Sequence, residues 1–252
     1  DEIDQLANTL SRQIQKWAPE EGLTTTAVPG LELIRSNSSL NNCVGSTVYD
    51  PSLCLIAQGS KTVWLGDREI HYGPLSCMVS AVHLPVLGKV TDASPERPYL
   101  GLKIAVEAQE VTDLVLELGE GLAGVEPQEC PENACGLSRV QAEKGLVDAV
   151  LRLVNLLDSP QDIRILAPLV RREIFYRALV GKIGLHMRKF AVADTQTHRI
   201  SKVIAVLKDR FTEPLRVREL ADMVNMSESS LFHSFKQVTR MSPVPVSYTH
   251  LR

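Results

Sequence analysis

Apolar positions along the chain follow two different periods, one over residues 31–107 and another after them. The first stretch is divided into short runs that are rich in β-branched and aromatic residues and are separated by turn residues, which is typical of strands. These runs are LELIRS, CLIAQGSKTVWLG, EIHYG, CMVSAV, GKVTDA and YLGLKIAVE. Gly66 and Asp67, between TVWL and REIHY, predict a tight hairpin. Many short strands at this spacing predict a small barrel or jelly roll.

Over residues 108–193 the apolar period becomes helical. The segment VQAEKGLVDAVLRLVNLLD places its apolar residues on one stripe, made of Leu146, Val150, Leu153, Val154 and Leu157. A helix start is expected at Ser159, Pro160 and Asp162, because Ser can cap, Pro suits the first turn and Asp favours the positive end of the helix dipole. Pro168 is expected to kink or restart this helix.

A third segment starts near Asp194 and again has a helical period. THRISKVIAVLKDRF sets apolar residues at helical spacing, with Lys and Arg on the opposite side: Ile200, Val203, Ile204, Leu207 and Phe211. TEPL then breaks the chain, because Pro214 cannot continue a helix. The next stretch, ELADMVNMSESSLFHSFKQVTRMSP, predicts two short helices separated at Asn225, Met226 and Ser227.

Local chemistry favours this helix pair. Asn225 occupies the turn, where Asn after Gly best tolerates a left-handed backbone, and Ser227 is a good N-cap for the second helix. Ala221 is a small residue at the point where two crossing helices must approach closely. Leu231 and Phe235 are expected to face inward. The outer surface then carries Ser229, Phe232, His233 and Lys236. The spacing alone fits a helix-turn-helix, whose second helix enters the major groove, or an αα-hairpin that binds nothing.

PLRVRELADMVNMSESSLFHSFKQVTRMSP resembles the first helix-turn-helix of the AraC/XylS family of bacterial transcription regulators. The matching features are ELA, the Met-Ser turn, the pair Phe235 and Lys236, and the closing Met241, Ser242 and Pro243. Other segments resemble the N-terminal half of one branch of that family: YDPSLCLIAQGSKTVWLGD, LPVLGKVTDASPERPYLGLKI, LAPLVRREIFYRALVG and ADTQTHRISKVIAVLKDRF. The resemblance covers nearly all of residues 1–245.

The resemblance implies an α+β fold in three parts. Residues 1–107 are expected to form a cupin-like sensor β-barrel with an N-terminal arm. Residues 108–193 are expected to form a helical dimerisation region, and residues 194–252 a partial, all-α AraC-type helix-turn-helix DNA-binding domain. The implied function is sequence-specific transcription regulation by a homodimer that binds double-stranded DNA, works with RNA polymerase and responds to a small-molecule effector. The residues assigned to DNA binding are Ser227, Ser229, Ser230, Phe232, His233 and Lys236.

Three features depart from the family pattern. Arg240 stands where the family usually has Gly after the recognition helix, so the helix end lacks the residue that most easily adopts a left-handed backbone. Phe232 and His233 occupy places where the family often has polar base-reading residues, and Phe232 is expected either to touch a thymine methyl or to pack. The family's domain has two helix-turn-helix units. Here VPVSYTHLR replaces the expected linker-helix start after Pro243, so the chain is expected to be cut short or misjoined there.

Composition and charge fit this class of protein. The chain is 44% hydrophobic and 23% charged, and its 252 residues suffice for two domains. The sequence has no long apolar run and no signal peptide, and its five cysteines lack the spacing of a disulfide framework. These features predict a cytoplasmic protein with no membrane partner. From residue 195 onward, nine Lys and Arg and five Asp and Glu give a net charge of +4. The first 194 residues contain 18 Lys and Arg and 25 Asp and Glu, which gives a net charge of −7. The basic segment fits an anionic partner or a merely solvated surface.

Candidate catalytic chemistry is sparse. Metal-dependent cupin enzymes need closely spaced histidines and a carboxylate on one metal, whereas His71 and His83 are twelve residues apart with no His-x-His or matching Glu. Cys130 and Cys135 lack the second pair of a zinc site. No phosphate loop, nucleophile elbow or triad is present. No catalytic residue, metal or cofactor is therefore expected. The alternative function is a cupin-type small-molecule-binding or enzymatic protein whose helical tail is purely structural.

The barrel interior is the expected place for an effector, because apolar and partly aromatic cavities suit small ligands. Trp64, Tyr72 and His83 are the candidate lining residues, and each is also compatible with a plain core position. The effector itself is implied only by the family resemblance.

Overall fold

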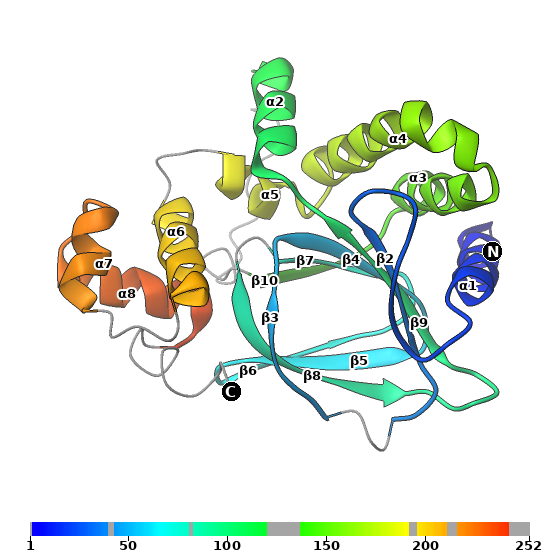
Figure 1. The fold of residues 1–252 in the computed structure, drawn as a ribbon, viewed down its shortest axis with the longest axis horizontal. Helices are drawn as coiled ribbons and strands as arrows, with labels where there is room; N and C mark the ends of the chain where they lie inside the picture. Colours follow the sequence, from blue (N-terminus) through cyan, green and yellow to red (C-terminus); the bar gives the residue numbers. More distant parts are fainter. Residues whose placement is uncertain are drawn as a thin grey trace.

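The computed structural model describes residues 2–39, 43–80, 83–119, 137–191, 196–210 and 216–241. Antiparallel sheets form the N-terminal part of the molecule, and helices follow them (Figure 1). The fold class is α+β, as the sequence predicts.

Two antiparallel sheets of the described chain face one another in Figure 1. The first sheet has the strand order β1 (Gly22–Thr25), β2 (Leu31–Ser36), β9 (Tyr99–Ala105), β4 (Ser52–Gln58), β7 (Ser76–Ser80) and β10 (Leu137–Gln141). The second has the order β3 (Cys43–Tyr49), β8 (Leu84–Asp92), β5 (Ser60–Leu65) and β6 (Arg68–Tyr72). Buried side chains from both sheets form the core, among them Leu33, Leu53, Val63, Leu102 and Ile104.

The predicted hairpin at Gly66 and Asp67 is confirmed. β5 and β6 pair from Lys61 opposite Tyr72 to Leu65 opposite Arg68, which leaves only these two residues in the turn. Gly66 has a φ of 59°, a left-handed conformation that favours glycine.

The run CLIAQGSKTVWLG forms two strands, β4 and β5, because the chain turns at Gly59. This residue has a φ of 79°, and a Cβ there would lie 2.5 Å from the carbonyl oxygen of Asp92. The turn therefore requires glycine.

Helix α1 (Glu2–Trp17) packs on β2, β4 and β9 of the first sheet and on α3 (Lys144–Asn155). Ala7, Leu10 and Ile14 form its buried side at helical spacing. After α3, the 3₁₀ helix η3 (Leu156–Asp158) anchors the end of α1, because the Asp158 carboxylate accepts hydrogen bonds from Lys16 Nζ at 2.7 Å and Trp17 Nε1 at 2.9 Å. The residues that the sequence assigns to an N-terminal arm therefore include a helix of the core.

Helix α4 (Pro160–Val180) begins where the sequence predicts, although the Ser159 side chain makes no capping hydrogen bond. Pro168 does not restart the helix, which runs through it. Proline removes the N–H that would bond the carbonyl of Arg164, and both residues lie on the exposed side of α4, where water can hydrate that carbonyl. Burial of Ile163, Ala167 and Ile174 holds the opposite side.

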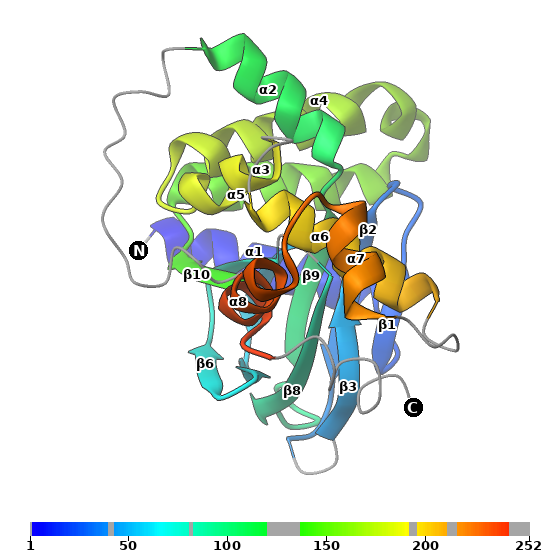
Figure 2. The ribbon, with the colours of Figure 1, turned by 90° about the vertical axis from the view of Figure 1, so that its left-hand side faces the viewer.

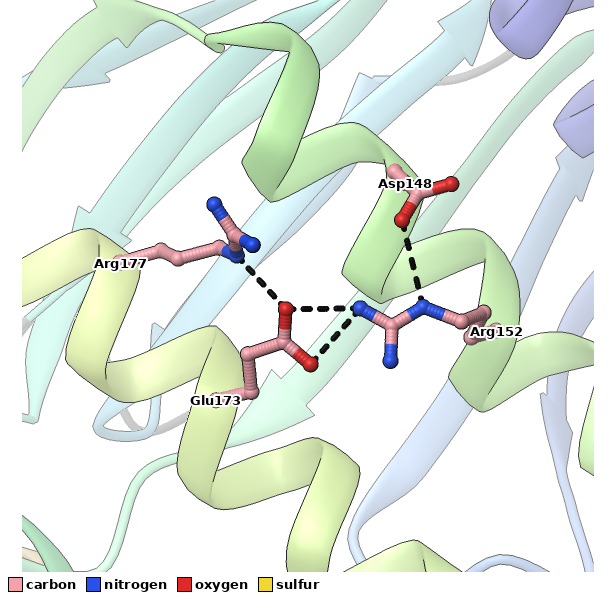
Figure 3. Close-up of polar contacts among 4 residues, drawn as sticks. All are labelled: Asp148, Arg152, Glu173 and Arg177. Carbon is pink, nitrogen blue, oxygen red and sulfur yellow. Dashed lines mark hydrogen bonds and ion pairs between the residues drawn. The ribbon is translucent and has the colours of Figure 1, made fainter.

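A charged cluster joins α3 to α4 (Figure 3). The Glu173 carboxylate accepts from Arg152 Nη2, 2.7 Å from each oxygen, and from Arg177 Nε at 2.8 Å. Arg152 Nε also donates to Asp148 at 3.2 Å. Hydrogen bonding from Arg152, followed by that from Arg177, lowers the pKa of Glu173. These side chains are partly exposed, so each pair stabilises the fold modestly.

Strand β10 corrects the expectation that the middle of the chain is helical throughout. It pairs antiparallel with β7, from Leu137 opposite Ser80 to Gln141 opposite Ser76. The residues VQ, which the sequence analysis includes in a helical segment, belong to this strand, and α3 starts only at Lys144. The stripe itself is confirmed, because all of its members are buried: Leu146, Val150, Leu153, Val154 and Leu157.

The remaining helices lie in two places: two of them lie above the sheets beside α4 in Figure 1, and the three that follow lie at the left of that view. Helix α2 (Ala108–Leu118) packs on α5 (Gly184–Ala191), which contacts α6 (Gln196–Asp209). Helix α6 contacts α8 (Glu228–Thr239), which contacts α7 (Val217–Met223). The predicted apolar side of α6 is buried at Ile200, Val203, Ile204 and Leu207. Phe211 and Pro214 lie outside the described residues. Within the described part of the chain, no helix has the length and apolar character needed to cross a membrane.

Candidate DNA-binding helix pair and effector cavity

A short turn at Asn225 joins α7 to α8, as predicted. Asn225 has a φ of 52°. Its N–H donates to the carbonyl of Asp222 at 3.2 Å, and the N–H of Met226 donates to the carbonyl of Ala221 at 3.0 Å. Ala221 is 1% exposed, and its small side chain permits the close approach of the two helices. The turn therefore fixes the angle at which α8 leaves α7.

The start of α8 confirms Ser227 as an N-cap. Its hydroxyl oxygen accepts from the N–H of Ser230 at 3.2 Å, and it lies 3.3 Å from the hydroxyl of Ser229. Glu228 stands in the first turn, where the helix dipole favours negative charge. The three serines thus lie together at the exposed N-terminal end of α8.

Helix α8 has a buried side and an exposed side. Leu231, Phe235 and Val238 are buried. On the other side His233 and Lys236 are exposed, and Phe232 is 36% exposed. All six residues assigned to DNA binding therefore share the N-terminal end or the exposed side of one helix, which is the arrangement that a groove-reading helix needs.

Two basic residues near this helix, Arg216 and Arg218, were not singled out from the sequence. Arg216 and Arg218 are exposed at the start of α7. Arg240 ends α8 with a φ of 60°, and its N–H donates to the carbonyl of Lys236 at 2.8 Å. Arginine therefore adopts the left-handed conformation for which the family usually has glycine. The repeated arginines of PLRVREL were the available sequence signal.

A cavity of about 400 Å³ lies between the two sheets, with walls from β2, β4 and β9 on one side and β3, β5, β6 and β8 on the other. This volume is within the range of small-molecule sites. Its apolar and aromatic lining consists of Leu23, Ile34, Val90, Leu102, Tyr49, Tyr72 and Tyr99.

The charged side chains of the cavity differ in their partners. Lys103 Nζ lies 2.6 Å from the Glu32 carboxylate, so its charge is neutralised locally. Lys61 Nζ donates to the hydroxyl oxygen of Tyr49 at 2.7 Å and lies 5.2 Å from the centroid of that ring. The ion pairs of the described residues do not include Lys61. Lys61 is thus a cavity cation held by a phenol instead of a carboxylate.

Burial keeps the acidic hydroxyl and thiol groups of the cavity neutral. It raises the pKa of Tyr49, Tyr72 and Tyr99, and it raises the pKa of the Cys54 thiol, which Lys61 opposes in part. A neutral phenol can donate one hydrogen bond and accept others. The cavity therefore offers the cations Lys61 and Arg35, neither of them in a described ion pair, and several neutral polar groups within a largely apolar wall.

Of the three candidate lining residues, Tyr72 lines this cavity, whereas Trp64 and His83 do not. Trp64 is half-buried and, because side chains alternate along β5, it points to the opposite side from Lys61. His83 lies one contact away, with Nδ1 2.9 Å from Oδ1 of the lining residue Asp50. Lys61 was missed, although the same alternation places it beside Val63 and Leu65 on the inward side.

The described residues contain no group of three or more His, Cys, Asp or Glu side chains that could hold a metal ion. His71 is engaged with Thr62, whose Oγ1 lies 3.0 Å from its Nδ1. Cys130 and Cys135 lie outside the described residues.

Residues 27–185 match the model of the AraC-type transcriptional regulator N-terminus. This match spans more than half of the chain and includes most of both sheets together with α2, α3 and α4. The chain therefore belongs to the AraC-type transcription regulators.

Solved structures show a more distant likeness. ToxT from Vibrio cholerae with bound unsaturated fatty acid is 10% identical, with 88% of this chain and 95% of that chain covered and a TM-score of 0.37. A second crystal form of ToxT is 11% identical, with 88% and 98% covered and a TM-score of 0.33. The AraC-like transcriptional activator CuxR is 12% identical, with 82% and 67% covered and a TM-score of 0.34. No curated protein matches the chain.

Proposed function

We propose that this AraC-type regulator binds double-stranded DNA through α8 and responds to a small molecule held between its two sheets. The observation that carries the DNA-binding part is the two-sided character of α8. Its apolar side is buried, and its opposite side leaves His233 and Lys236 exposed to solvent. The function rests on this helix pair together with membership of the family.

Each exposed residue of α8 has a distinct proposed role. Ser227, Ser229 and Ser230 lie at the N-terminal end, where exposed hydroxyl groups and the helix dipole favour a backbone phosphate. The ring of His233 can bond a base edge, and Phe232 can contact a thymine methyl. Lys236 is the proposed phosphate contact further along the helix.

The effector is proposed to occupy the cavity around Lys61 and Tyr72. Most of its wall is apolar, and Lys61 supplies a charged hydrogen-bond donor. A small molecule with an apolar body and an acceptor or anionic group fits this chemistry. Trp64 and His83 stand outside the wall itself.

The protein is proposed to act as a homodimer through α4. This helix exposes large apolar side chains along one side: Ile165, Leu169, Tyr176 and Val180, which are 66%, 60%, 43% and 38% exposed. Their spacing follows the helical repeat, so they lie along one side of the helix, where a second copy can cover them. RNA polymerase is the further partner that the family resemblance implies.

The DNA-binding role is tested by fluorescence anisotropy of labelled duplexes at several salt concentrations. Lys236→Ala is expected to weaken binding to all sequences and to lower the slope of log K against log salt by about one, as loss of one phosphate contact does. His233→Ala is expected to change sequence preference. Lys182→Ala, which removes an exposed lysine after α4, is the matched control and should bind like the parent. Equal weakening by both lysine variants would show that α8 has no special role.

A further inference from the structure

We infer that the β5–β6 hairpin couples the cavity to the DNA-binding helix, so that an apolar anion bound at Lys61 alters the last turn of α8. This inference rests on the proposed function, because it joins the cavity to the helix which that function assigns. Lys61 and Tyr72 are directly opposite one another at the open end of the hairpin, and both line the cavity. The turn at its other end touches α8.

The contact between the turn and α8 is close. A Cβ built on Gly66 would lie 2.6 Å from the carbonyl oxygen of Arg240 and 2.8 Å from its Cβ. No side chain fits between the two backbones at this point. Figures 1 and 2 both place the end of α8 near β6, which agrees with this contact. A displacement of the turn toward or away from α8 must therefore move Arg240 or break the contact.

The hairpin is paired along its whole length between the cavity and the turn. Its strand β5 is also paired with β8 at Gly88 and Leu87. Across the hairpin, Thr62 Oγ1 lies 3.0 Å from His71 Nδ1. Lys61 is five residues from Gly66, a span of roughly 17 Å at the rise of an extended strand. A continuous paired ribbon therefore links the two sites.

The receiving end is the left-handed cap of α8. The Arg240 N–H donates to the carbonyl of Lys236 at 2.8 Å. Beside it, Thr239 Oγ1 donates to the carbonyl of Phe235 at 2.7 Å and accepts from the N–H of Met241 at 3.1 Å. Movement of Arg240 thus acts on the helical turn that carries Lys236, the proposed phosphate contact.

The cavity end is suited to an anion with an apolar body. An ammonium group has three donors, and the described contacts of Lys61 use one of them on Tyr49. Gly88 leaves room for the stem of Lys61, because a Cβ there would lie 2.8 Å from Lys61 Cε. An anion that bonds Lys61 restrains β5 at the point where it pairs with Tyr72. We expect this restraint to reach the turn and slow opening of the last turn of α8.

The test uses 8-anilinonaphthalene-1-sulfonate, an aromatic anion, as the probe, and hydrogen–deuterium exchange of residues 236–241 as the readout. In the parent protein, amide exchange of these residues should be slower by a factor of about five or more with the probe bound than without it. Gly66→Ala should abolish this change while leaving probe affinity unaltered. Gly119→Ala is the matched control, because Gly119 also has a positive φ, of 47°, but a Cβ there meets nothing within 4 Å. It should retain the full change.

Two further variants keep the outcomes distinct. Lys61→Met should weaken probe binding at the cavity, whereas probe bound to exposed apolar surface would be unaffected. Arg240→Gly removes a side chain from the contact without adding strain to the hairpin, so it should reduce the change in exchange even if Gly66→Ala fails to fold. Probe binding that depends on Lys61 but leaves α8 exchange unchanged would refute the coupling while the cavity stands. Probe affinity that is the same in the parent and in Lys61→Met would overturn both the anion site and the coupling. The DNA-binding proposal is tested separately, by the anisotropy assay, and does not depend on either result.

Discussion

Arg171 is the most deeply buried charged side chain among the described residues, and replacing it provides a sharp test of how the helices are held to the sheets. The residue is 7% exposed. Its guanidinium lies 2.7 Å from the Glu110 carboxylate and donates to the carbonyls of Pro29 at 3.1 Å and Ala105 at 3.0 Å. One side chain on α4 thus binds α2, the β1–β2 loop and the end of β9.

The expected cost of Arg171→Met follows from these contacts. Methionine keeps an apolar stem of similar length, but the Phe175 ring loses its cation, two carbonyls lose a charged donor and Glu110 loses its partner. Removing one member of a buried ion pair costs about 3–5 kcal/mol. Glu110 is 33% exposed and can be rehydrated in part, so we expect about 3 kcal/mol, at the lower end of that range.

Urea denaturation followed by the fluorescence of Trp17 and Trp64 measures this loss, with unfolding free energies taken from the midpoint and slope. Arg172→Met is the matched control, because the neighbouring Arg172 pairs with Glu117 on the surface, where the side chains are 46% and 67% exposed. That variant should lose at most about 1 kcal/mol. A loss of the same size in both variants would refute the assignment of Arg171 as a buried anchor.

Three other predictions concern pH, the end of α8 and assembly. Because the folded-state pKa of Glu173 is lowered, its contribution to stability is present above the unfolded pKa of about 4.3 and is lost as pH falls. In urea titrations, the difference in unfolding free energy between the parent and Glu173→Gln should therefore shrink from about pH 5 to about pH 3. A difference that grows on acidification would contradict this. Arg240→Gly should raise the unfolding free energy by about 0.5–1 kcal/mol, because glycine adopts the φ of 60° without steric cost, whereas a loss of stability would show that the arginine side chain matters more. Leu169→Glu should be monomeric by light scattering at concentrations at which the parent forms dimers. Leu87→Glu, at a 46% exposed position of β8, is the control and should still form dimers. A dimer of the Leu169→Glu variant would exclude the apolar side of α4 as the dimer interface.

Features set by neighbouring residues were predictable from the sequence. The left-handed Asn225, the Ser227 cap and the inward Leu231 and Phe235 all follow from local chemistry and helical spacing, and each is confirmed. The Gly66 turn was predictable for the same reason.

Features set by distant pairing were not predictable. β10 is a strand because β7 offers it a partner, and its short sequence LSRVQ has no strong period of its own. The helix α4 continues through Pro168 because its opposite side is buried. Likewise, Lys61 and Tyr49 meet in the cavity through the packing of two sheets, which no spacing along the chain reveals.

Site-specific photocrosslinking tests most directly whether the outer side of α8 contacts DNA. p-Benzoylphenylalanine is introduced in place of Phe232, which is 36% exposed on α8, and in a second variant in place of Leu169, which is 60% exposed on α4. Each protein is irradiated with labelled duplex DNA at low salt. We predict a covalent protein–DNA adduct from position 232 that unlabelled duplex suppresses, and none from position 169. Adducts of equal yield from both positions, or from position 169 alone, would contradict the assignment of α8 as the DNA-binding helix.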